Sequence, residues 1–189
     1  MKRIVLAITG ASGVLYGIKL LEALHELNDI QTHLILSEAA AWNISYETDY
    51  SVDAVCSLAD YVYDNSHIWE KPASGSYSID AMVINPCSMK TLAAIRCGLA
   101  DNLITRAADA TIKEQRKLII CPRETPLSAI HLDNMAYLAH LGVCILPPMP
   151  AFYHKPQTIE HLLQHHCMKV FDQLGLPFDD VGRWGEHHD

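Results

Sequence analysis

Short apolar runs alternate along the chain with longer segments in which apolar residues recur every three or four positions. Most of the runs are rich in Ile, Val and Leu without polar alternation, as expected of strands buried on both faces of a parallel sheet. The five stronger runs are residues 4–8, 32–36, 81–85, 118–121 and 143–146, and a weaker sixth covers residues 61–63. Their alternation with helical segments predicts an α/β fold with a mainly parallel sheet.

The segments between these runs have the periodicity of amphipathic helices. The predicted helices cover residues 14–27, 37–47, 89–96, 102–115, 128–141 and 158–174. The last should bury one face made of Ile159, Leu162, Leu163, Val170, Phe171 and Leu174. Neither a repeat nor a linker is visible, so we expect a single domain over residues 1–189, with a C-terminal tail from about residue 176.

The composition supports a globular protein and narrows its partners. Half of the 189 residues are apolar and 19% are charged, which excludes disordered and low-complexity classes. A formal charge of −8 disfavours a nucleic-acid binder, which would usually be basic. The longest apolar stretch, residues 142–152, contains three prolines and is too short to span a membrane. Met1-Lys2-Arg3 leads straight into the first strand rather than into a signal peptide, so we expect a cytoplasmic location.

The cysteines and histidines give little sign of a metal site. The six cysteines form no C-x-x-C pair and are irregularly spaced, which favours buried thiols over a disulfide framework. His161 and His165 stand four residues apart on a predicted helix and could ligate zinc. No H-E-x-x-H motif or paired cysteine supports that site, so we expect these histidines on a solvated helix face and no metal ligands.

Polar residues follow five of the predicted strands. In open parallel sheets, ligands bind outside the carboxyl ends of the strands, so these residues should meet at one rim. Gly10 and Gly13 allow close backbone approach before a helix start, which suits a phosphate or another anion; a tight turn is the alternative. Ser88 and Thr91 are either ligands or an N-cap and a first-turn residue. A phosphate set of hydroxyls and a cation would be Ser12, Ser37, Ser88, Thr91 and Arg123.

A second group of charged and aromatic residues suits an anionic substrate. Arg123 and Glu124 stand between two prolines, so a loop held at both ends would fix a cation and a carboxylate at a strand end. Lys113 lies in a charged segment, where a solvated helix end is the alternative. Trp184 either packs on the core or lines a site. The other members of the group are Glu47, Arg106, Tyr153 and Lys169.

Six motifs occur in an order that carries a family resemblance. They are Thr9-Gly10-Ala11-Ser12-Gly13, Glu47-Thr48-Asp49, Pro86-Cys87-Ser88-Met89-Lys90-Thr91, Arg106-Ala107-Ala108-Asp109, Pro122-Arg123-Glu124-Thr125-Pro126 and Pro150-Ala151-Phe152-Tyr153-His154. Together they resemble the UbiX/Pad1 family of flavin prenyltransferases, earlier described as aromatic-acid decarboxylases. The resemblance covers nearly the whole chain and implies a flavoprotein-like domain with a Rossmann-like three-layer α/β/α sandwich.

The resemblance also implies roles for individual residues. FMN contacts are implied at Gly10, Ala11, Ser12, Ser37, Ser88, Met89, Lys90, Thr91 and Arg123. Tyr153 and Lys169 match positions that bind the prenyl phosphate, and Arg106 is a further candidate for substrate binding. Glu47, Lys113, Glu124 and Trp184 match other active-site positions, which makes them the candidate catalytic residues.

The implied reaction joins a dimethylallyl group from dimethylallyl monophosphate to reduced FMN at N5 and C6, for use by a UbiD-type decarboxylase. Many prenyltransferases hold Mg²⁺ with D-D-x-x-D, but the sole Asp-Asp pair here, Asp179-Asp180, lacks that pattern. We therefore expect a metal-independent enzyme whose cations and hydroxyls stabilise the leaving phosphate.

Two other functions stay open. One is direct decarboxylation of an aromatic acid. A related alternative is flavin-dependent decarboxylation of cysteine, but that family carries a P-x-M-N-x-x-M-W segment that His131-Leu132-Asp133-Asn134-Met135 does not match, which argues against it. The other is an FMN-carrying subunit, which would not need Glu47, Lys113, Glu124 and Lys169.

The resemblance implies a homododecamer with sites at subunit junctions. Large apolar surface on a soluble chain usually marks an interface. Candidate interface residues are Trp42, Ile44, Tyr46, Trp69, Tyr77, Leu99 and Leu103.

Overall fold

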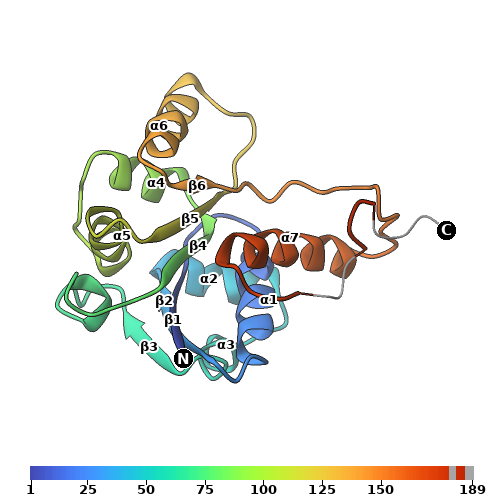
Figure 1. Ribbon diagram of the computed structural model, residues 1–189, viewed down its shortest axis with the longest axis horizontal. Helices are drawn as coiled ribbons and strands as arrows, with labels where there is room; N and C mark the ends of the chain where they lie inside the picture. Colours follow the sequence, from blue (N-terminus) through green and yellow to red (C-terminus); the bar gives the residue numbers. More distant parts are fainter. Residues whose placement is uncertain (179–181, 186–189) are drawn as a thin grey trace.

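The computed structural model describes residues 1–178 and 182–185 and shows six parallel strands in one sheet (Figure 1). The sheet order is β3-β2-β1-β4-β5-β6, and every neighbouring pair is parallel. The strands are β1 (Lys2–Ile8), β2 (Ile30–Leu36), β3 (Tyr61–Asp64), β4 (Ala81–Cys87), β5 (Lys117–Pro122) and β6 (Cys144–Ile145). Asp179-Asp180, considered above for a metal motif, lies outside the described residues.

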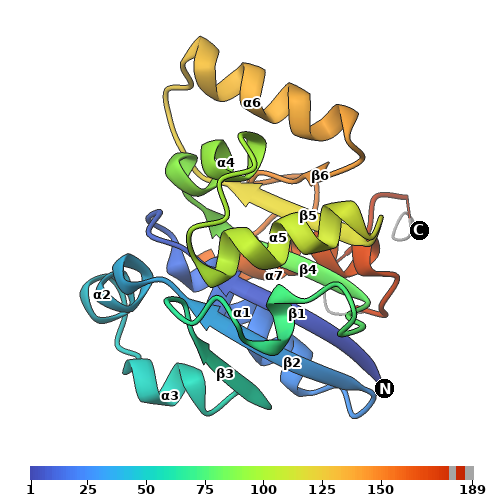
Figure 2. The same cartoon turned by 90° about the vertical axis from the view of Figure 1, so that its left-hand side faces the viewer.

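Helices cover both faces of this sheet, which confirms the three-layer α/β/α sandwich (Figure 2). The α-helices are α1 (Val14–His25), α2 (Glu38–Glu47), α3 (Val52–Cys56), α4 (Met89–Arg96), α5 (Leu103–Lys113), α6 (Ala129–His140) and α7 (Ile159–Leu174), with a 3₁₀ turn at Lys71–Ala73. Helices α1 and α7 pack on the face that carries Leu6, whereas α4 and α5 pack on the face that carries Val5. Successive side chains of a strand point to opposite faces, so both sides of β1 are buried.

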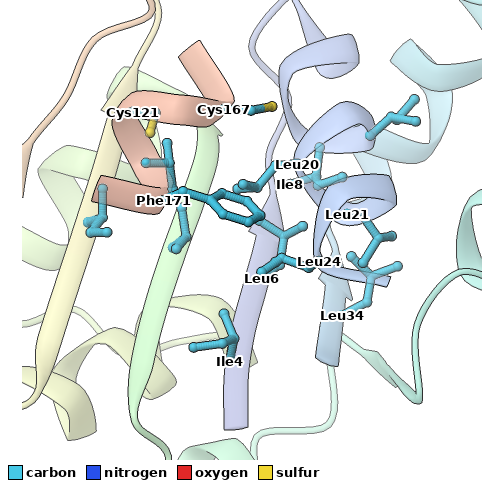
Figure 3. Close-up of a cluster of buried hydrophobic side chains, with 14 of the residues drawn as sticks. Ile4, Leu6, Ile8, Leu20, Leu21, Leu24, Leu34, Cys121, Cys167 and Phe171 are labelled. Atoms are coloured by element: carbon cyan, nitrogen blue, oxygen red, sulfur yellow. The ribbon is translucent and has the colours of Figure 1, made fainter. Parts of the chain in front are cut away.

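The larger cluster of buried side chains joins α1 and α7 to the sheet (Figure 3). Phe171 of α7 inserts its ring among side chains of β1 and α1, beside Leu6 and Leu24. Val5, Leu6 and Ala7 have no exposed surface, which explains why this strand is continuously apolar instead of alternating.

The structure corrects the predicted exposure of α7. Ile159 is 73% exposed, because the buried cluster takes Cys167, Val170 and Phe171 from α7 and nothing from its first turn. Of the two histidines predicted on a solvated face, His165 is only 6% exposed, and its neighbour His166 is only 4% exposed. Helix α7 crosses α1 so that His166 packs edge-on against the ring of Tyr16 and bonds to the side chain of Asn85 in β4.

The structure also divides the predicted interface residues. Trp42, Tyr46, Trp69 and Leu99 are exposed, and Trp42 stacks on Tyr46 with ring centroids 4.7 Å apart. Ile44 and Leu103 are fully buried within one chain, because α2 and α5 turn these positions toward the sheet. Tyr77 is half-buried against the smaller cluster.

The sequence also failed to indicate α3, a five-residue helix capped by the side chain of Ser51.

Close packing of α1 on the sheet depends on Gly17. A Cβ atom at this position would collide with the carbonyl oxygen of Asn85 and lie 2.8 Å from Cδ1 of Ile8. We expect Gly17→Ala to lower the free energy of unfolding by about 2 kcal/mol, since overpacking outweighs the gain in helix propensity. Gly142→Ala is the comparison, because its Cβ meets nothing within 4 Å and should cost only about 1 kcal/mol for its positive φ. Urea unfolding of both variants measures the difference, and equal losses would contradict this packing argument.

Candidate functional site

A cleft of about 810 Å³ lies at the carboxyl ends of four neighbouring strands. Gly10 follows β1, Ser37 follows β2, Asn65 follows β3 and Ser88 follows β4. The starts of α2, α4 and α5 complete the walls. The cleft therefore brings together five of the nine predicted FMN residues: Gly10, Ser37, Ser88, Lys90 and Thr91.

Two helices begin at this cleft with serine caps. The Ser37 hydroxyl accepts a hydrogen bond from the backbone N–H of Ala40 at 3.1 Å. The Ser88 hydroxyl accepts one from the backbone N–H of Thr91 at 3.2 Å and donates to the Thr91 hydroxyl at 3.1 Å. The capping interpretation of Ser88 is thus confirmed. It is compatible with ligand binding, because the starts of α2 and α4 bring partial positive charge and backbone donors to the same cleft.

The loop after β1 is held close to α2. A Cβ atom on Gly10 would collide with the side chain of Ala39, so a glycine is required at this close approach. Gly13, the N-cap residue of α1, adopts a left-handed conformation with φ of 92° and has no side chain that could cap the helix. Ala11 is buried, and its carbonyl oxygen accepts from the Asn43 side chain at 3.3 Å.

Glu47 supplies the anion at the start of α1. One of its carboxylate oxygens, Oε2, accepts from the backbone N–H groups of Gly13 at 2.7 Å and Val14 at 3.4 Å. The sequence predicted that Gly10 and Gly13 prepare this helix start for a phosphate or another anion. Within the chain, that anion is the side chain of Glu47, which reaches across from the end of α2.

Arg123 links the ends of three strands at the rim. Its Nε donates to the carbonyl oxygen of Ser12 at 2.8 Å, and its backbone N–H donates to the carbonyl oxygen of Cys87 at 3.2 Å. Burial raises the pKa of Tyr16, and the nearby Arg123 guanidinium opposes that shift. The adjacent Glu124 is exposed, and its carboxylate accepts a local hydrogen bond from the backbone N–H of Thr125 at 2.9 Å.

A second group of predicted residues lies on an extension of the fold. Residues 146–158 run away from the sheet and return as α7, with residues 182–185 beside them (Figure 1). There the ring of Tyr153 meets that of Trp184 edge-on, with centroids 5.6 Å apart. Lys169, on the exposed side of α7, pairs with Asp172 at 3.7 Å. This arrangement places Trp184 against another candidate site residue instead of against the buried core.

Three more predicted residues also lie apart from the cleft within one chain. Lys113 ends α5 near the amino end of β5, on the side of the sheet opposite to the cleft. Its Nζ lies 3.3 Å from Oε1 of Glu114. Arg106 is paired with Asp109 at 2.9 Å. Met89 packs against the smaller buried cluster beneath α4.

Several polar residues of the cleft were not predicted from the sequence. Asn102 caps α5 through its side chain, and Asn65 accepts from the backbone N–H of Ile104 at 3.0 Å. The cap pattern from Asn102 to Thr105 is visible in the sequence and could have placed this helix start at the rim. The other missed polar or charged residues are Glu38, Asp101 and Thr105.

Known proteins match this chain over almost its full length. The sequence matches the Flavoprotein family over residues 1–170. It is 53% identical to the flavin prenyltransferase LpdB of Lactiplantibacillus plantarum, across 97% of this chain and 98% of that protein. The chain belongs to the UbiX/Pad1 family of flavin prenyltransferases.

Two solved structures of UbiX-type proteins superpose closely on the fold. One is AnUbiX (PadA1) in complex with FMN and dimethylallyl pyrophosphate, with a TM-score of 0.96, 46% identity, and coverage of 99% of each chain. The other is a dodecameric, FMN-dependent UbiX-like decarboxylase from Escherichia coli O157:H7, with a TM-score of 0.95 and 46% identity, covering 96% of this chain and 98% of that one.

The cleft fits FMN in size and chemistry. Its volume lies within the usual range of about 300–1,000 Å³ for sites that bind small molecules and cofactors. Two helix starts, several hydroxyls and Lys90 offer partners for a phosphate group.

No group of three or more potential metal-ligating side chains occurs in residues 1–178 and 182–185. Within the same ranges, no helix combines the length and apolar character needed to cross a membrane.

Proposed function

We propose that the protein transfers a dimethylallyl group from dimethylallyl monophosphate to reduced FMN, forming bonds at N5 and C6. The observation that carries this proposal is 53% identity to a flavin prenyltransferase over 97% of the chain. It is supported by a cleft that gathers Gly10, Ser37, Ser88, Lys90 and Thr91 at the strand ends.

FMN would be held mainly by the starts of α2 and α4, with Arg123 at the rim beside the loop that carries Ser12. When bound and reduced, it supplies the nucleophilic N5 and C6 positions. The chain's own task is to hold the prenyl donor against them and to exclude water, because placing reactants together removes much of the entropic barrier.

Departure of the phosphate requires cations and donors in place of a metal ion. The candidates are Tyr153, on the segment 146–158, and Lys169, on α7, and both side chains are exposed. The allylic cation that develops would be stabilised by the faces of Tyr153 and Trp184, whose rings lie edge to face. Lys113 could contribute only from another copy of the chain, since it lies at the amino end of β5, away from the cleft at the carboxyl ends.

Closure at C6 releases a proton that a base must accept. Glu47 already accepts two backbone hydrogen bonds at the start of α1, so its carboxylate has a structural role there. Glu124 is exposed at the end of β5 and is the better placed carboxylate. We therefore assign the role of general base to Glu124.

The deciding experiment is a mass spectrum of the flavin after anaerobic incubation of the protein with reduced FMN and dimethylallyl monophosphate. The proposal expects a mass raised by the added prenyl group. An unchanged FMN mass would instead support the carrier function. Release of CO₂ from an aromatic acid by this protein alone would favour the decarboxylase function, under which the related Escherichia coli protein is described.

Metal independence is a separate prediction. We expect EDTA to leave the rate of flavin prenylation unchanged, because Arg, Lys and Tyr side chains stabilise the leaving phosphate in this proposal. The measurement compares initial rates with and without chelator after dialysis. A loss of activity that Mg²⁺ restores would show that a metal takes part.

The proposal extends to the assembly and the use of the product. We propose a homododecamer, by similarity to the dodecameric relative, with Trp42, Tyr46, Trp69 and Leu99 available for contacts between copies. The product would pass to a UbiD-type decarboxylase, and the cytoplasm is the proposed location. Light scattering of the purified protein measures the assembly directly.

A further inference from the structure

An unexpected histidine touches the hydroxyl of Tyr153. Nε2 of His165 lies 2.9 Å from the phenolic oxygen, within hydrogen-bond distance. His165 is buried although it sits on the helix that also carries the exposed Lys169, one turn further on. The contact therefore joins a buried, fixed ring to a tyrosine that is 39% exposed.

The imidazole of His165 is held from a second side by His154. The two rings are stacked, with centroids 5.0 Å apart and planes 3° from parallel. Both ring nitrogens of His154 are buried and have no hydrogen-bond partner among the described residues. His154 is thus a packing surface for its neighbour in the structure, and it keeps the His165 ring turned toward Tyr153.

The hydrogen bond between His165 and Tyr153 can free the phenolic hydrogen of Tyr153 to donate to an anionic ligand. If Nε2–H of His165 donates to the phenolic oxygen, the phenol hydrogen is free to point at a ligand. A neutral imidazole is sufficient for this, since one ring nitrogen carries a hydrogen. Burial, aided by His154 and Lys169 and opposed by Asp172, lowers the pKa of His165 and favours that neutral form.

We propose that His165 is a positioning residue that orients the Tyr153 hydroxyl toward the phosphate of the prenyl donor. The inference rests on the proposed function and deepens it, because it assigns to α7 a part in donor recognition through a residue that does not itself touch the ligand. Lys169 would supply the charge and Tyr153 the directional hydrogen bond.

The test is a double-mutant cycle between His165 and Tyr153, read as kcat/KM for dimethylallyl monophosphate. We expect His165→Leu and Tyr153→Phe each to lower kcat/KM about 10-fold, the scale of one hydrogen bond to a charged ligand. The double variant should lose no more than Tyr153→Phe alone. His165→Gln, which keeps an N–H donor, should recover most of the activity, and the Kd for FMN should stay unchanged throughout.

A merely structural role gives a different pattern. Losses from His165→Leu that persist in the Tyr153→Phe background, or a Gln variant as poor as Leu, would overturn the inference. If His165→Leu fails to fold, His165→Phe keeps a ring stacked on His154 and still removes the donor. An active wild-type protein with an unaffected His165→Leu variant refutes only this inference, whereas an inactive wild-type protein refutes the proposed function and the inference with it.

Discussion

Replacing Glu124 with Gln is expected to slow formation of prenylated FMN about 10²-fold, the usual scale for loss of a general acid or base. The carboxylate stands at the end of β5, directly after Arg123, and is exposed. Gln has nearly the same shape and can still accept the local hydrogen bond from the backbone N–H of Thr125. FMN binding should therefore be kept, and the loss should appear in kcat.

The control for this variant is Glu26→Gln at the end of α1, an exposed carboxylate far from the carboxyl ends of the strands, where the cleft lies. Its turnover should equal that of the wild-type protein. If Glu124→Gln turns over within twofold of the wild-type rate, Glu124 has only a structural role in its loop. In that case Glu47 or the released phosphate would have to accept the proton.

The sheet and most helices could be predicted because their signals are local. Uninterrupted apolar runs mark strands buried on both faces, and serine caps mark helix starts such as those of α2 and α4. The rim follows from topology, because parallel strands place all their carboxyl ends at one edge. These rules were enough to bring Gly10, Ser37 and Ser88 into one cleft.

Features that depend on contacts distant in sequence were missed. Nothing local indicates that Glu47 caps α1 across 34 positions, or that α7 buries His165 and His166. Polar residues on a helix normally indicate solvent, and only the crossing of α7 over α1 reverses that expectation. The division into one domain and a tail from about residue 176 stays a prediction.

Lys113 and Glu124 lie at opposite ends of β5, and this separation leads to a second prediction with a large expected effect on activity. Helix α5 ends with Lys113 at the amino end of β5, while Glu124 follows the carboxyl end of the same strand. One active site can use both residues only if two copies of the chain meet, as the proposed dodecamer allows. We expect Lys113→Met, like Glu124→Gln, to lower prenylation about 10²-fold.

Mixed oligomers of these two poor variants should then regain activity. In a closed symmetric oligomer every site is built from the same two surfaces. Where one copy supplies the cleft and another supplies Lys113, random 1:1 assembly gives about one half of the sites native Glu124 and, independently, about one half native Lys113, so about a quarter have both. The measurement is the rate of flavin prenylation after the two variants, carrying different tags, are co-expressed and purified through both tags. Two samples purified apart and mixed without subunit exchange are the control and should stay near 1% of the wild-type rate, about the level of either variant alone. Doubly tagged oligomers that are no more active than either variant would contradict a site shared through Lys113, and a fully active Lys113→Met variant would remove that lysine from the chemistry.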